Sequence, residues 1–123
     1  MDFKCPSCEG NSLKIDMSLE LAAGDVDETS VQTVKCETCQ FRGIAVYRES
    51  RRGSFDSDSF WHVGFEVSDG DLEFVLSGLR LCPDRANKHC QCQTHLAWAK
   101  RHWSAPERDM TVKRWFRMDL VEA

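Results

Sequence analysis

Four of the seven cysteines are arranged as two short pairs with the spacing of metal ligands. Each pair has the form Cys-x-x-Cys, with Cys5 and Cys8 in the first and Cys36 and Cys39 in the second. Such a turn holds two sulfur atoms on one side of the backbone, and two turns supply the four thiolates of a tetrahedral zinc site. Because four protein ligands fill that coordination sphere, we expect a structural ion here and no activated water.

A second group of potential ligands lies within the segment 82–95. Its members form a Cys₃His set: Cys82, Cys90, Cys92 and His95. This set predicts a second zinc ion, so two Zn²⁺ per chain are expected. His89 is a rival for the fourth position. If water stood there instead of a histidine, the site would be open and Lewis-acidic, with Asp84 or the unligated His89 as the local base.

The hydrophobic pattern predicts the elements that position the first set of ligands. Apolar and polar residues alternate over 11–21, the period-two pattern of a half-buried strand. Residues 31–35 and 44–48 are further β-prone runs, and a turn region covers 22–30. The first 50 residues are therefore expected to form a three-stranded antiparallel sheet that carries both cysteine pairs.

The second half of the chain shows a different pattern. A strand is expected over 60–67, a helix from about Asp71 until Pro83 stops it, and a second helix over 93–102. A final strand or extended arm follows residue 104. The polar segment 51–59 is the expected linker, which gives an N-terminal domain of residues 1–50 and an α+β zinc-binding element of residues 60–123.

Residues 3–48 resemble a zinc ribbon, in which two cysteine turns are joined by a β-hairpin. Pro6 follows the first cysteine, and Gly10 and Gly43 follow each pair at a short distance, as in ribbon knuckles. The chain departs from the commoner form because Glu9 and Gln40, and not glycine, directly follow the second cysteine of each pair. The resemblance implies a structural zinc. The remainder of the chain resembles no family that we can name.

Asp27 and Glu28 near the hairpin tip suggest a narrower resemblance. Ribbons of transcript-cleavage factors carry an Asp-Glu pair at a comparable distance before the second cysteine pair, where it helps to hold magnesium in the polymerase active site. This chain lacks the arginine that precedes those acids and has Ala22-Ala23-Gly24-Asp25 instead. The alternative is a solvated acidic turn.

Charge is unevenly distributed along the 123 residues, whose net charge is −4. Residues 1–79 are acidic, whereas residues 80–123 are basic and rich in tryptophan. The basic side chains are Arg80, Arg85, Lys88, Lys100, Arg101, Arg108, Lys113, Arg114 and Arg117, and the aromatic ones are Trp98, Trp103, Trp115 and Phe116. The opposite charges could attract each other within one molecule, or the basic half could meet an acidic partner. For the basic and aromatic side chains three interpretations stay open: solvated helix charges with tryptophans packed inward, a protein interface, and nucleic-acid binding.

Taken together, these features favour a zinc-stabilised, non-enzymatic adaptor that presents a surface to another protein. A nucleic-acid-binding or transcription-associated zinc-ribbon protein is the alternative, and a zinc hydrolase that uses the second site is the third hypothesis. The chain start has no basic and apolar leader pattern, and no run approaches a membrane span. We therefore expect a cytoplasmic protein with reduced thiols and no membrane partner. The sequence specifies no oligomeric state.

Overall fold

A computed structural model describes residues 2–23, 27–50, 59–103 and 105–119. These residues form one antiparallel sheet with strand order β1-β2-β3-β4-β5, two α-helices and a short 3₁₀ helix. The elements along the chain are β1 (Leu13–Ala23), β2 (Asp27–Cys36), β3 (Arg42–Ser50), β4 (Ser59–Val67), α1 (Asp69–Leu81), α2 (Gln93–Trp98), η1 (Pro106–Arg108) and β5 (Val112–Arg117). The expected α+β class is confirmed.

The expected three-stranded sheet was too small, because the sheet has five strands. β3 pairs with β4 from Ile44 opposite Phe65 to Ser50 opposite Ser59, and β4 pairs with β5. Strands from both halves of the chain therefore share one sheet. The physical reason is that β3 and β4 each carry an unpaired edge unless they meet. The expected linker 51–59 lies, apart from Ser59, outside the described residues.

The helices differ from expectation in length more than in place. Helix α1 begins after Ser68, whose hydroxyl accepts a hydrogen bond from the N–H of Asp71 and so caps the first turn. Helix α2 ends at Trp98 and not at residue 102. Beyond Ala99 the N–H groups of Lys100 and Arg101 bond to carbonyls three residues back, which tightens the chain into turns.

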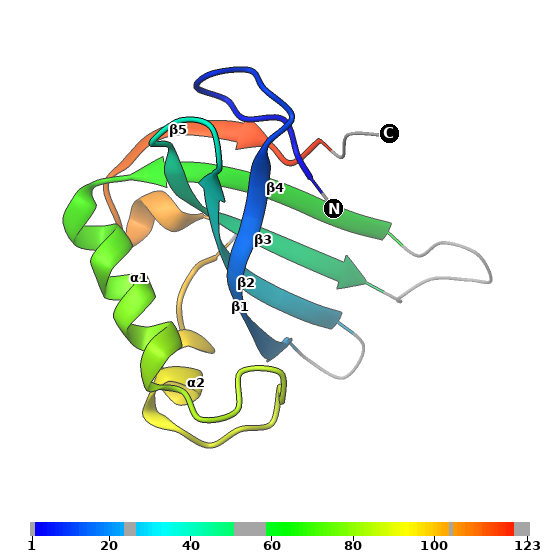
Figure 1. Cartoon of the computed structure of the whole chain (residues 1–123). Coiled ribbons are helices and arrows are strands. Elements are labelled where there is room, and N and C mark those ends of the chain that lie inside the picture. Colours follow the sequence, from blue (N-terminus) through cyan, green and yellow to red (C-terminus); the bar gives the residue numbers. More distant parts are fainter. Residues whose placement is uncertain (1, 24–26, 51–58, 104, 120–123) are drawn as a thin grey trace.

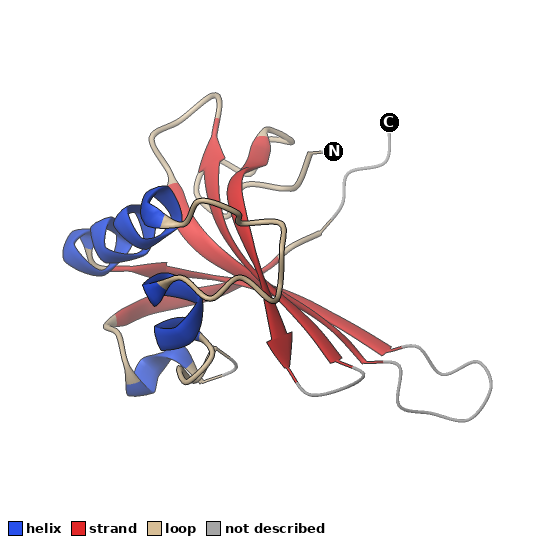
Figure 2. Cartoon of the chain, turned by 90° about the horizontal axis from the view of Figure 1, so that it is seen from below, coloured by secondary structure: helices blue, strands red, loops and turns tan. Residues whose placement is uncertain are grey.

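One face of the sheet is covered by the helices (Figures 1 and 2). Strand residues such as Leu19, Val31 and Phe65 pack there against the apolar side of α1. Helix α2 packs against α1 at Gly78, where the ring of Trp98 leaves no room for a Cβ atom. The core members are Leu19, Leu21, Val31, Ile44, Val46, Phe65, Val67, Leu72, Val75, Leu76, Leu79, Cys82, Trp98, Trp103 and Met110.

The opposite face holds a second, smaller cluster under the N-terminal segment. Phe3, Leu13 and Val34 belong to it, together with Cys5, Cys36, Phe41, Ala45 and Met118. The alternating residues of β1 are divided between the two clusters, since a register shift between Ile15 and Met17 moves the later residues to the helix-covered face. A single strand thus contributes to both cores.

One edge of the sheet, strand β1, makes a main-chain contact with the loop after α1. The loop after α1 lies along edge strand β1, where the N–H of Glu20 donates to the carbonyl of Arg85 over 2.9 Å. Strand β5 forms the other edge.

None of the described helices is both long and apolar enough to cross a membrane.

Candidate metal centres

The first set of cysteines converges at the end of the sheet where β1 begins and β2 ends. The Sγ atoms of Cys5 and Cys39 lie 3.7 Å apart, as do those of Cys8 and Cys36, and all four atoms lie within 4.8 Å of one another. A tetrahedral zinc ion with bonds of about 2.3 Å separates its sulfur ligands by about 3.8 Å. The spacing therefore fits a Cys₄ site and is far longer than a disulfide bond.

Local backbone structure aims these sulfurs inward. The N–H groups of Ser7, Thr38 and Phe41 each donate to a cysteine Sγ at 3.4 Å, which holds both turns around the site. The N–H of Cys5 donates to the carbonyl of Gly10 and closes the first turn. Glu9 has φ of 62°, the left-handed conformation in which the ribbon pattern usually places glycine. The turn is therefore made at this position despite the missing glycine.

Two hydroxyl groups form an outer layer that the sequence analysis did not find. Ser12 Oγ lies 3.1 Å from the Cys36 sulfur, and Thr38 Oγ1 lies 3.3 Å from it. These contacts, first Ser12 and then Thr38, lower the pKa of Cys36 to about 5. The hydrogen bond from the Phe41 N–H lowers the pKa of Cys39, but burial and the neighbouring thiols outweigh it and raise this pKa to about 12. A divalent cation would favour the thiolate form of both.

The second set of ligands converges at the other end of β1. His95 Nδ1 lies 3.2 Å from the sulfur of Cys82 and 3.4 Å from that of Cys92, and Cys82 and Cys90 have sulfurs 4.0 Å apart. A tetrahedral zinc would separate a nitrogen and a sulfur ligand by about 3.6 Å. All four atoms lie within 4.8 Å of one another, so this group too has the geometry of a metal site.

His95 is oriented by a contact to the sheet. Its Nε2 atom lies 2.9 Å from the main-chain carbonyl of Glu20 in β1. Because a carbonyl only accepts, the proton belongs on Nε2, and Nδ1 presents its lone pair toward the three cysteines. This is the arrangement in which a metal-binding histidine is held by a second hydrogen bond. His95 is 3 % exposed, so it is secluded from water.

Helix ends supply the remaining ligands of the second site. Cys82 is the C-cap of α1, and Cys92 is the N-cap of α2, where its sulfur accepts from the N–H of His95 at 3.4 Å. Burial raises the pKa of Cys82 to about 11. Burial raises the pKa of Cys92, but the hydrogen bonds with His95 outweigh it and lower this pKa to about 6. The exposed His89, the expected rival of His95, is not part of the cluster.

The acidic pair near the hairpin tip is partly engaged in an internal contact. Glu28 forms an ion pair with Lys88, with 3.4 Å between Nζ and Oε1. This contact joins the segment 82–95, which carries the second ligand set, to β2. The side chain of Asp27 lies outside the described residues. The contact of Glu28 supports a structural role for this acid.

The basic C-terminal part is largely committed to contacts within the chain. Arg114 pairs with Glu66 at 2.8 Å, and Arg117 lies 3.7 Å from Asp119. The guanidinium of Arg101 stacks over the rings of Phe74 and Trp103. Trp98 and Trp103 are buried, whereas Trp115 is 44 % exposed.

No known protein family, no curated protein and no solved structure matches this chain.

Proposed function

We propose that this chain is a zinc-stabilised, non-enzymatic protein-interaction module with two structural Zn²⁺ ions. Residues 3–48 serve as a ribbon-like unit around the first ion. The observation that carries the proposal is that each ligand group offers four donor atoms within 4.8 Å of one another. Zinc sites with four protein ligands are structural, whereas catalytic sites keep a position for water.

The surroundings of the second site argue against a hydrolase. The only bases that the local sequence offers, Asp84 and His89, are exposed and lie outside the ligand cluster. His95, which would have to leave for water to bind, is buried and held to β1 by its bond to Glu20. A water-activating site would require breaking that contact.

Exposed apolar side chains supply the surface for a protein partner. Phe74 and Leu81 are 48 % and 77 % exposed, and their spacing of two helical turns places them together on the outer side of α1. The buried residues of α1 lie on the opposite side. Because exposed apolar residues that share one face are costly in water, they favour a surface that a partner covers.

Nucleic-acid binding stays the second candidate, supported by strand β5 with Lys113, Arg114 and Trp115 on its exposed positions. It is weaker because phosphate binding requires free cations and stacking requires accessible rings. Arg114 and Arg117 are already paired with carboxylates, and two of the four tryptophans, Trp98 and Trp103, are buried.

The first experiment counts metal ions and measures nucleic-acid binding on the same protein. Native mass spectrometry is expected to show two zinc ions per chain. Titration with DNA and RNA of mixed sequence at about 50 mM salt is expected to show no binding, because weak electrostatic binding is strongest at low salt. Binding that falls steeply as salt rises would contradict the adaptor proposal and favour the alternative.

The second experiment tests the α1 surface with the zinc-loaded chain. Cross-linked partners would be identified with the wild type, purified, and titrated against Leu81→Glu and against the control Glu107→Lys, an exposed position on η1. We expect Leu81→Glu to weaken binding about tenfold or more, as loss of a central apolar anchor does, and the control to bind normally. Equal binding by both variants would remove α1 as the interaction surface.

A further inference from the structure

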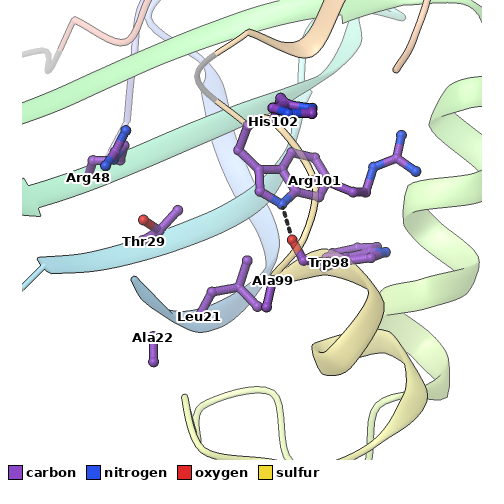
Figure 3. Close-up of a pocket in the computed structure, with 9 residues that line it drawn as sticks. Leu21, Ala22, Thr29, Arg48, Trp98, Ala99, Arg101 and His102 are labelled. Atoms are coloured by element: carbon purple, nitrogen blue, oxygen red, sulfur yellow. Dashed lines mark hydrogen bonds between the residues drawn. The ribbon is translucent and has the colours of Figure 1, made fainter. Parts of the chain in front are cut away.

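A pocket separate from both metal ligand sets lies between the strands of the sheet and the segment that follows α2. Its volume is about 210 Å³. Leu21 and Thr29 line it from the first two strands, Arg48 from β3, and Ala99 and His102 from the segment after α2 (Figure 3). Trp103 of the same segment completes the lining. No carboxylate is among the lining residues.

The polar wall of the pocket is the cross-strand pair of Thr29 and Arg48, which stand directly opposite each other in β2 and β3. Although the main chain of Arg48 is paired in the sheet, its side chain makes no hydrogen bond or ion pair with any residue that the structure describes, so the five N–H donors of the guanidinium remain available. Thr29 is 5 % exposed and adds a hydroxyl beside the cation. A guanidinium without a carboxylate partner favours an anionic ligand.

The apolar wall is built from aromatic and aliphatic groups. Trp103 is 5 % exposed, and its Nε1–H is already used by a 2.9 Å bond to the carbonyl of Trp98 (Figure 3). The indole therefore offers the pocket apolar ring surface and no free donor. Leu21 and Ala99 complete this wall. Such a surface suits a planar ring by stacking and by burial of apolar area.

The other two basic side chains at the pocket, Arg101 and His102, are engaged elsewhere. The guanidinium of Arg101 points toward α1 (Figure 3) and is held between two rings, with its Cζ atom 4.8 Å from the ring centroid of Phe74 and 5.6 Å from that of Trp103. His102 stands on another side of the pocket from Arg48, and its Nδ1 is 3.5 Å from a carboxylate oxygen of Asp109 (Figure 3). Arg48 is thus the group that provides the positive charge for a ligand.

We propose that this pocket binds a small aryl carboxylate, with the carboxylate on Arg48 and Thr29 and the ring against Trp103. The volume supports this size class, because a protein cavity of about 150 Å³ accepts benzene and the remaining space suits one carboxylate. The site goes beyond the adaptor function, since none of its polar contacts involves a metal ligand. An adaptor with such a pocket would be responsive to a metabolite of this class.

The test pairs each acid with its neutral amide: benzoate with benzamide, and phenylacetate with phenylacetamide. ¹H–¹⁵N spectra of the zinc-loaded protein resolve the indole N–H signals, so Trp103 reports on the pocket and the exposed Trp115 serves as an internal control. We expect saturable shifts at Trp103 for at least one acid below about 10 mM, and binding about tenfold weaker for its amide. The Trp115 signal should stay in place.

Variants of Arg48 locate the charge. Arg48→Met keeps the length of the side chain and removes its donors, so we expect about tenfold weaker acid binding, with partial recovery in Arg48→Lys. Arg117→Met makes the same charge change at a side chain that is 88 % exposed and should bind the acid normally. The proposal is overturned if acid and amide bind equally, if Arg48→Met binds as well as the wild type, or if neither acid shifts the Trp103 signal.

Discussion

The replacement His95→Ala tests the second metal site and the sheet contact at once. The change removes the only nitrogen ligand, whose Nδ1 lies 3.2 Å and 3.4 Å from two cysteine sulfurs. A structural zinc site contributes on the order of 12 kcal/mol through four ligands, so one ligand accounts for about 3 kcal/mol. The change also leaves the Glu20 carbonyl without its 2.9 Å donor, a loss of about 1–2 kcal/mol.

The summed loss of about 4–5 kcal/mol is large beside the stability of a typical domain, about 5–15 kcal/mol. For a chain of this length it corresponds to a drop of about 15–20 °C in Tm. Differential scanning calorimetry and native mass spectrometry measure the two effects, and we expect one zinc ion per chain in place of two. His95→Cys should restore the ligand without the bond to Glu20, and so should recover most of the loss.

The matched control is His89→Ala, because His89 belongs to the same loop but is exposed and lies outside the cluster. It should retain two ions and lose less than about 2 °C, as expected for a surface substitution. The reasoning is refuted if His95→Ala keeps two ions with a Tm close to that of the wild type, or if the His89 variant loses the ion.

Four further changes test other parts of the structure. Gly64→Ala places a Cβ atom 2.2 Å from ring atoms of Phe116 and should cost about 2–3 kcal/mol in chemical unfolding, whereas Gly70→Ala meets nothing within 4 Å and should be neutral or slightly stabilising. Ser12→Ala removes the 3.1 Å contact to Cys36 and should weaken zinc binding at the first site about tenfold in chelator competition, while Ser7→Ala, which keeps the N–H donor, should not. Glu9→Gly relieves a φ of 62° and should raise the Tm, at a gain of about 1 kcal/mol. Burial lowers the pKa of His62 below the ordinary 6.5, so its stabilising effect is complete above pH 6.5 and is lost as the pH falls toward the folded-state pKa. The Tm of His62→Gln should therefore fall by less than the Tm of the wild type when the pH is lowered from 7.5 to 5.5.

The ligand sets could be predicted from the sequence because metal coordination imposes short spacings. Cys-x-x-Cys turns and the Cys₃His cluster carry their geometry locally, so the residues that the structure brings together are the predicted ones. Ser12 could not be found in this way. Its contact to Cys36 joins positions 24 apart, and a serine among polar neighbours has no pattern that marks it.

Local sequence patterns also predicted the strands, whereas they did not predict that the strands form one sheet. Alternation predicted the strand that became β1, but the register shift after Ile15 sends its two ends to opposite faces, and no single-strand pattern indicates such a bulge. The pairing of β3 with β4 joins the two halves of the chain across the segment that follows Ser50, and the polar composition of that segment had indicated a linker between domains. This is why a three-stranded sheet with separate later strands was expected where one sheet takes up all five strands.

The second ligand set and the loop that carries it cover part of the free edge of β1. An unpaired edge exposes N–H and C=O groups that can pair with another chain. On β1 both main-chain groups of Glu20 are occupied, its N–H by the Arg85 carbonyl and its carbonyl by His95. Both partners belong to the segment 82–95 that carries the second ligand set, so an ion bound there would also hold this cover against the edge of β1.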